Sequence, residues 1–184
     1  MDESEIAPKL YTVGHSTHEL SRLVELVEGH GVRAIGDVRR VPRSRRMPHF
    51  AGDALARSLA SERIRYEHLP ELGGFRRPLS GSPNAGWRHD GFRGYADHMT
   101  SDEFAAGVAR LSELAGEMPT AVMCAEAQWT SCHRRLLADA MVVRGWRVIH
   151  IGSDGRSSEH ELTAFAQVDG ESLTYPPEQE SLDV

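Results

Sequence analysis

Residues 120–135, TAVMCAEAQWTSCHRR, decide the fold of this chain. A short apolar run, residues 121–123, ends in Cys124, and four loop residues separate that cysteine from Trp129, where a helix is expected to begin. A strand followed by a loop and a helix is the repeating unit of an open α/β sheet. Ligands of such sheets bind beyond the carboxyl ends of the strands. We therefore expect a site around Cys124.

The same stretch holds both cysteines of the chain, because Cys132 follows Cys124 by eight positions. We expect Cys132, His133 and Arg134 to lie in the first turn of the helix. Unpaired N–H groups at a helix start favour anions and lower the pKa of a nearby thiol. This arrangement predicts Cys124 as a nucleophile of depressed pKa. The alternative is that Cys124 is a small buried hydrophobic residue at a strand end.

Working outward, segments of strand and helix pattern alternate along the chain. Strands are expected over residues 9–13, 32–38, 64–69, 120–124 and 146–151, and helices over 17–30, 51–63, 91–99, 101–117 and 129–145. This alternation predicts an α/β fold with about five mostly parallel strands and helices on both faces of the sheet. Residues 75–90, between the third strand and the next helix, are expected to be irregular.

The predicted single domain spans residues 9–175. Residues 1–8 form an acidic extension, and residues 176–184 are expected to be a disordered acidic tail. Residues 158–166 favour a short helix followed by an extended segment. A hairpin that turns at Asp169-Gly170 is the alternative.

Composition restricts the class of protein. No apolar run approaches the ~20 residues of a membrane span, and the first residues lack a signal-peptide pattern. Two cysteines in such a chain favour a reducing, cytoplasmic setting. The net charge of −6 hides a division, because residues 30–100 hold 13 arginines against 7 acids. Five of those arginines fall within eight positions, residues 39–46.

If the sheet is parallel, five loops meet at one edge. They bring together residues 14–16, Asp37 with Arg39, residues 71–74, Cys124 with Glu126, and residues 152–154. We expect catalytic roles for Cys124, His15 and Glu126, the last two as acid or base groups. The predicted anion-binding residues are Arg39, Arg45, Arg134 and Ser16. Supporting roles are expected for Asp37, Gly73, Gly74, Cys132, His133 and Trp129.

The alternative for each of these residues is structural. His15 can be a hydrogen-bonded structural histidine, and the arginines can form a solvated loop. Asp37 can pair with Arg39 or with Arg134 as a buried ion pair. Trp129, like Trp87, can either stack a ring or fill the rim of the site. The cysteine spacing is not that of a zinc ribbon, so neither a metal nor a cofactor is predicted.

Four blocks of the sequence, TVGHST, GDVRRVPRSRRMPHF, LGGFR and MCAEAQWTSCHR followed by VIHI, together resemble the domain-of-unknown-function 488 family (DUF488). The resemblance runs from about Tyr11 to Ile151. It implies a small, mainly prokaryotic, cytoplasmic α/β protein without an agreed activity, and it implies no cofactor or substrate. The residues that carry the resemblance are Gly14, His15, Ser16, Asp37, Arg39, Pro42, Ser44, Arg45, Gly73, Gly74, Cys124, Glu126, Cys132, His133 and Arg134.

Three hypotheses for the function follow. The first is an enzyme that acts on a phosphate-bearing small molecule, such as a nucleotide or nucleic-acid fragment, held by arginines beside Cys124. The second is a non-catalytic nucleic-acid-binding accessory module that uses the arginine loop and Trp87. The third is a thiol redox or metal-binding sensor that uses Cys124 and Cys132. The sequence predicts neither a reaction class nor an oligomeric state.

Overall fold

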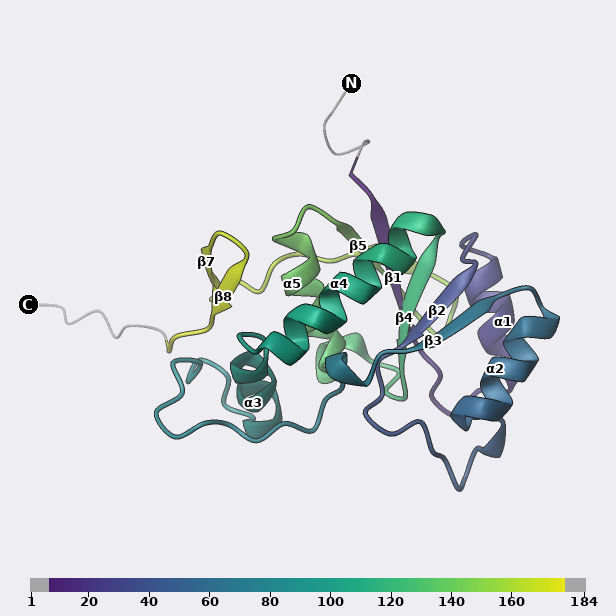
Figure 1. Cartoon of the computed structure of the whole chain (residues 1–184), viewed down its shortest axis with the longest axis horizontal. Coiled ribbons are helices and arrows are strands. Elements are labelled where there is room, and N and C mark those ends of the chain that lie inside the picture. Colours follow the sequence, from purple (N-terminus) through teal and green to yellow (C-terminus); the bar gives the residue numbers. More distant parts are fainter. Residues whose placement is uncertain (1–6, 178–184) are drawn as a thin grey trace, which may run out of the picture.

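A mostly parallel sheet forms the centre of the computed structural model, which describes residues 7–177 (Figure 1). The elements in chain order are β1 (Lys9–Gly14), α1 (Leu20–Glu28), β2 (Ala34–Asp37), α2 (Gly52–Ser61), β3 (Arg65–His68), α3 (Asp90–His98), α4 (Asp102–Glu117), β4 (Thr120–Cys124), α5 (Arg134–Val142), β5 (Arg147–Ile151), β6 (Ser157–Glu159), β7 (Gln167–Asp169) and β8 (Ser172–Thr174). The predicted α/β class is confirmed. The outer parts of the predicted N-terminal extension and acidic tail, residues 1–6 and 178–184, lie outside the described residues.

The strand order in the sheet is β3-β2-β4-β1-β5-β6. The first five strands are parallel, as predicted, and only β6 is antiparallel. From β1 the chain continues to β2, which lies on one side of the β4–β1 pair. From β4 it continues to β5, which lies on the other side of that pair. Because β1 and β4 are neighbours, their carboxyl ends border a crevice where the direction of winding reverses. Open α/β sheets bind ligands at such a point.

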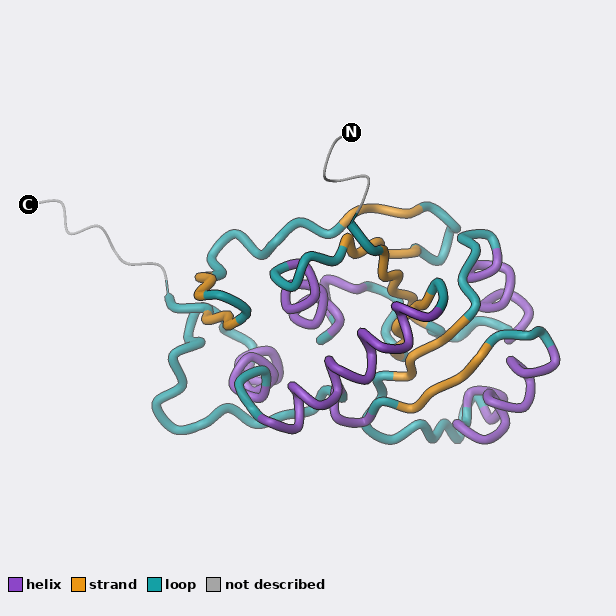
Figure 2. Tube along the Cα trace, turned by 45° about the horizontal axis from the view of Figure 1, so that its top comes forward, coloured by secondary structure: helices purple, strands orange, loops and turns teal. Residues whose placement is uncertain are grey.

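Two helical layers cover the sheet (Figures 1 and 2). On one face, Leu23 and Val27 of α1 and Leu55 of α2 are fully buried in a cluster with Ile35 of β2. On the other face, α3, α4 and α5 pack with Val122 of β4 and with the β7–β8 hairpin. Each fully buried leucine or valine stabilises the fold by about 1.5–3 kcal/mol, so each layer is held mainly by apolar burial. Among the described helices, none is long and apolar enough to cross a bilayer.

The central stretch departs from the prediction at one point. The helix predicted from Trp129 is a single 3-10 turn, Trp129–Ser131, and α5 begins only at Arg134. Between them Cys132 is extended, with φ −124° and ψ 150°. Cys132 and His133 therefore precede the helix instead of lying in its first turn. A loop therefore positions these two side chains, and helical periodicity does not describe a loop.

Two further expectations were wrong in detail. The helix expected over 158–166 is instead strand β6 followed by irregular chain, and the alternative hairpin at Asp169-Gly170 is present as β7–β8. The three residues of β6 are exposed and polar, so the strand lacks the alternation that marks a half-buried strand. Helix α1 is also shorter than predicted, because Ser16 adopts a positive φ of 48° and no side chain caps Leu20.

The loops after β1 and β4 are joined backbone to backbone. His15 N–H donates to the Cys124 carbonyl at 2.9 Å, and Ser16 N–H donates to the Ala125 carbonyl at 2.9 Å. Gly14 makes this approach possible, because a Cβ atom there would lie 1.9 Å from the Glu126 carbonyl oxygen. Any side chain at position 14 forces the two loops apart.

We expect Gly14→Ala to destabilise the protein by more than about 3 kcal/mol, because the added methyl group meets backbone that cannot move aside. Gly116→Ala is the matched control, since nothing lies within 4 Å of that position on α4. The control should be neutral or more stable by up to ~1 kcal/mol, the helix propensity gain. Urea denaturation of both variants measures the difference. Equal stabilities would contradict the proposed loop contact.

Candidate functional site

A cavity of about 910 Å³ opens at the carboxyl ends of β1, β2 and β4. We call it the thiol cavity, because both cysteines contribute to its wall. Its lining residues are His15, Arg39, Arg40, Val41, Arg43, Ser44, Gly74, Phe75, His89, Gly91, Phe92, Cys124, Ala125, Glu126, Ser131, Cys132 and His133. Four of the five loops expected to converge supply these residues. The fifth, residues 152–154, lines a different cavity.

The two cysteines and His133 form one cluster in the wall of the thiol cavity. Cys124 ends β4 and is half-buried, whereas Cys132 is buried. Their two Sγ atoms and one ring nitrogen of His133 all lie within 4.8 Å of one another. Among residues 7–177, this is the one group of three histidine, cysteine or acidic side chains close enough to hold a metal ion.

The two thiols differ in acidity, in the opposite sense to the prediction for Cys124. The Cys124 thiol donates to Cys132, and this hydrogen bond lowers the pKa of Cys132 to about 3 against the effect of burial. His133 and Arg134 act in the same direction. The same hydrogen bond, together with burial, raises the pKa of Cys124. Both shifts make Cys132 the more acidic of the two thiols.

His133 presents one defined ring nitrogen to the thiols. Its Nε2 lies 3.2 Å from the Val38 carbonyl, which can only accept, so Nε2 carries the proton. Nδ1 then faces the Cys132 Sγ at 3.7 Å. Gly74 keeps Nδ1 uncovered, because a Cβ atom at position 74 would lie 2.8 Å from it. The ring therefore directs Nδ1 toward the two thiols.

Arg39 is held in the cavity wall by partners in the fold. Its Nε and Nη2 donate to the two oxygens of the buried Asp37 at 2.8 and 2.5 Å, and its Nη1 donates to His15 Nε2 at 3.2 Å. Burial opposes the charged form, but these bonds to Asp37 raise the pKa of Arg39 above its ordinary value. Tyr66 adds a bond from its hydroxyl to Asp37 at 2.8 Å.

His15 is a neutral member of the same cluster. Burial lowers its pKa to about 4, and its Nδ1 donates to the Ser16 carbonyl at 2.8 Å. The ring also stacks on Phe50, with centroids 4.1 Å apart. Both ring nitrogens are thus engaged before any ligand arrives. This favours a structural or positioning role for His15 over the proton transfer that we expected.

Arg134 is fully buried behind Cys132, outside the cavity lining. Its Nε donates to the Cys132 Sγ at 3.4 Å, and its Nη2 donates to the Glu126 and Ala127 carbonyls. No carboxylate of the described chain lies within ion-pair distance of it. A buried cation normally requires a counter-charge, because the desolvation penalty is several kcal/mol per ion.

A chain of hydrogen bonds connects Arg134 to the buried Asp139. Arg134 Nη1 donates to Thr12 Oγ1 at 3.4 Å, and Thr12 meets His150 Nδ1 at 2.7 Å. His150 Nε2 meets His160 Nδ1 at 2.9 Å, and His160 Nε2 meets Asp139 at 2.8 Å. With both histidines neutral, every donor points toward Asp139. We call these five residues the relay; it links a buried cation to a buried anion.

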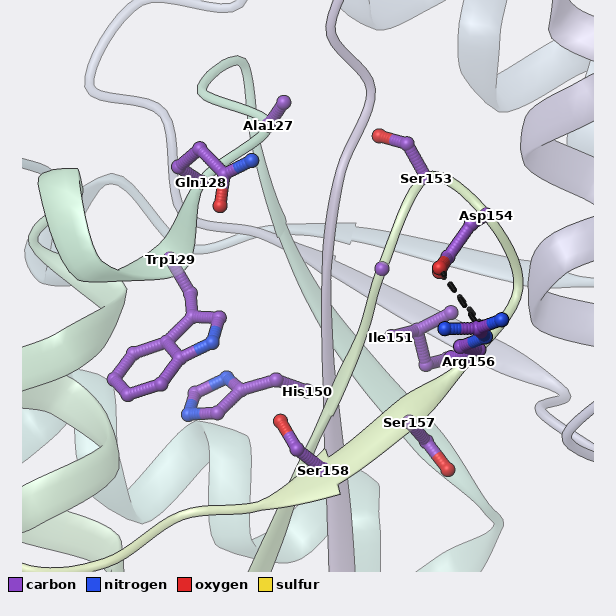
Figure 3. Close-up of a pocket in the computed structure, with 11 residues that line it drawn as sticks. Ala127, Gln128, Trp129, His150, Ile151, Ser153, Asp154, Arg156, Ser157 and Ser158 are labelled. Atoms are coloured by element: carbon purple, nitrogen blue, oxygen red, sulfur yellow. Dashed lines mark hydrogen bonds and ion pairs between the residues drawn. The ribbon is translucent and has the colours of Figure 1, made fainter.

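Trp129 covers the relay from outside. Its indole stacks on the His150 imidazole with centroids 3.9 Å apart and planes 5° apart (Figure 3). Both rings line a second cavity of about 220 Å³, which also contains Ser153, Asp154 and Arg156. Trp129 therefore shields a buried polar chain, and does not face the thiol cavity.

The exposed arginines of the loop over residues 39–46 form two pairs. Arg40 and Arg43 line the thiol cavity and are exposed, and no carboxylate within residues 7–177 pairs with either. Arg45 and Arg46 are exposed on the same loop but do not line the cavity. Of the predicted anion ligands, Arg39 and Arg134 are held by partners in the fold, and Ser16 and Arg45 lie outside the lining.

Several residues of the site were not among the predicted ligands. Phe75, His89 and Phe92 line the cavity from the irregular segment and α3, and Phe75 is almost fully exposed with a φ of 58°. A positive φ at a bulky residue is rare. The long irregular stretch over residues 75–90 was the available signal for Phe75 and His89, whereas Phe92 lies on α3. Glu126 lies at the exposed edge of the cavity, and one of its oxygens accepts the Gln128 N–H at 3.0 Å.

Comparison with known sequences assigns the family. The sequence model described as a domain of unknown function, DUF488, matches residues 19–141, more than half of the chain. The chain belongs to the DUF488 family. The matched region contains most of the thiol cavity of this DUF488 protein, but His15 precedes it. Neither a search of curated proteins nor a search of solved structures found a match.

We expect Asp139→Ala to cost at least about 3 kcal/mol of stability. The change leaves the donors of His160, Thr163 and Tyr175 without an acceptor and removes the anion that faces Arg134 along the relay. Glu161→Ala, an exposed acid nearby in the chain, should change stability by less than ~0.5 kcal/mol. Chemical denaturation compares the two, and a loss below about 1 kcal/mol for Asp139→Ala would show that the relay is not a buried ionic unit.

Proposed function

We propose that this DUF488 protein is an enzyme that acts on a phosphate-bearing small molecule, such as a nucleotide or a short nucleic-acid fragment, bound in the thiol cavity. The observation that carries the proposal is that two exposed arginines without a carboxylate partner in the described residues lie with a thiol cluster in the wall of one cavity. The cavity lies at the crevice between β1 and β4, and its volume is within the range of about 300–1,000 Å³ typical of small-molecule sites.

The anion would be held by Arg40 and Arg43. A guanidinium group matches the oxygens of a phosphate in pairs, and each charge-assisted hydrogen bond contributes about 1.5–3 kcal/mol. Arg39 is paired with Asp37, and Arg134 donates to the Cys132 Sγ and to backbone carbonyls. Arg40 and Arg43 are exposed, have no carboxylate partner in the described part of the chain, and need not give one up to bind. They therefore take the anion-binding role in this proposal.

The remainder of the ligand would lie against rings. Phe75, Phe92 and His89 also line the cavity, and aromatic faces suit a planar base. Base stacking on an aromatic ring contributes about 1–3 kcal/mol. The groups close enough to act on the bound molecule are Cys124, Cys132 and His133, with Glu126 at the edge as an exposed proton acceptor.

The nucleic-acid-binding alternative has less support. Trp87, the ring expected to stack bases, is buried under the Arg135 guanidinium, whose carbon lies 4.9 Å from the ring centroid. Arg76 is paired with Glu103, and Arg93 donates to the Trp87 carbonyl. The exposed side chains of Arg40, Arg43, Arg45 and Arg46 still offer a surface for a polyanion.

We expect the Arg40→Ala/Arg43→Ala double variant to bind inorganic phosphate and nucleoside phosphates at least ~10-fold more weakly than wild type, since a loss of about 1.4 kcal/mol already gives that factor. The Arg45→Ala/Arg46→Ala variant has the same charge change on the same loop and should keep wild-type affinity. Calorimetric titration at fixed salt measures both.

Three results bear on the choice between these functions. Absence of phosphate binding by wild type contradicts the small-molecule proposal. Equal losses in the two double variants, with a steep salt dependence on single-stranded oligonucleotides, indicate a polyanion surface instead. A loss confined to Arg40 and Arg43 supports the cavity.

A further inference from the structure

The cluster of Cys124, Cys132 and His133 has the donor atoms and spacing of a metal centre. In a tetrahedral zinc site, bonds of about 2.3 Å to sulfur and 2.0–2.1 Å to nitrogen place ligand atoms roughly 3.5 Å apart. The Cys132 Sγ and His133 Nδ1 are 3.7 Å apart, and all three donor atoms lie within 4.8 Å. A divalent ion needs only small side-chain movements to reach all three.

The surroundings of the ligands support the same conclusion. Metal-bound histidines usually donate their second ring nitrogen to a carbonyl or carboxylate. His133 does so, since Nε2 donates to Val38 O and leaves Nδ1 directed at the thiols. Arg134 Nε donates to the Cys132 Sγ at 3.4 Å, as a group outside the coordination shell does for a metal thiolate. Gly74 provides room beside Nδ1.

The buried charges also allow an ion. The relay connects Arg134 to Asp139, so this cation has an anionic counterpart at the other end of a hydrogen-bonded chain. Two cysteine thiolates would then balance the two positive charges of the metal. The site as a whole would be neutral, which is the favourable condition for a buried ionic cluster.

We propose that Cys124, Cys132 and His133 bind one thiophilic divalent ion of the zinc type, with the fourth coordination position open to the thiol cavity. Two thiolates and an imidazole favour zinc over magnesium or calcium, which prefer oxygen ligands. Three protein ligands with one open position are the arrangement of catalytic zinc sites, whereas structural sites have four.

The metal centre would supply the reactive group of the cavity. An ion with an open position can accept a water molecule or an oxygen of the bound anion. Arg40 and Arg43 line the same cavity and would hold the phosphate beside it. This last step rests on the proposed function, whereas ion binding by the three ligands does not.

The test uses the full chain, reduced, stripped with chelator and handled without oxygen. We expect titration with Co²⁺ to produce thiolate-to-cobalt charge-transfer and d–d absorption that saturates at one equivalent, and Zn²⁺ to abolish both bands by displacement. Cys124→Ser, Cys132→Ser and His133→Ala should each lose or strongly weaken them. His89→Ala, which removes a cavity-lining imidazole outside the cluster, should keep them.

Far-ultraviolet circular dichroism of each stripped variant shows whether it is folded. If a variant is not folded, the Co²⁺ titration of wild type alone tests the metal site. No absorption change in reduced wild type overturns the metal site, as does full binding by both serine variants. Retained phosphate binding by Arg40 and Arg43 in a wild type that binds no metal leaves the proposed function standing. Metal binding without phosphate binding removes only the proposed function.

Discussion

The contact between the loops after β1 and β4 is the constraint on which the site depends. Two backbone hydrogen bonds, from His15 to Cys124 and from Ser16 to Ala125, hold these loops together, and Gly14 leaves no atom between them. These joined loops form one wall of the thiol cavity, and the loop after β2 forms another. The thiol of β4 consequently faces an opening instead of a packed core.

The arginines around the thiol cavity fall into a buried pair and an exposed pair. Arg39, which follows β2, and Arg134, the first residue of α5, are buried and are held by partners in the fold. A charge in such a place is stable only while those partners stay. Arg40 and Arg43 lie farther out and are solvated. The inner arginines therefore shape and charge the wall of the cavity, and the outer ones remain available to a ligand.

The sequence predicted the five parallel strands, because apolar runs and turn residues are local signals. Of the five loops expected to meet, four line the thiol cavity, and residues 152–154 line the other one. It did not predict which contacts each residue makes in the folded chain, or which thiol has the lower pKa. The lower pKa belongs to Cys132 because Cys124 donates to it, and that contact exists only in the folded chain. The relay likewise joins Thr12 to His150, which is 138 residues away. No sequence pattern in either segment predicts this contact.

The orientation of the His133 ring bears on which state the two thiols adopt. The possible states are a disulfide, a single reactive thiolate and a pair of metal ligands. A disulfide between Cys124 and Cys132 makes no use of an imidazole lone pair, and a single reactive thiolate requires only a proton partner. In the structure, Val38 holds the opposite ring nitrogen, Gly74 leaves Nδ1 uncovered, and both sulfurs lie within 4.8 Å of it. These features have a free-energy cost, because they restrict side-chain rotation at two positions and require a glycine at position 74. The proposed metal ion would account for them together, because it would accept lone pairs from the two sulfurs and from the nitrogen.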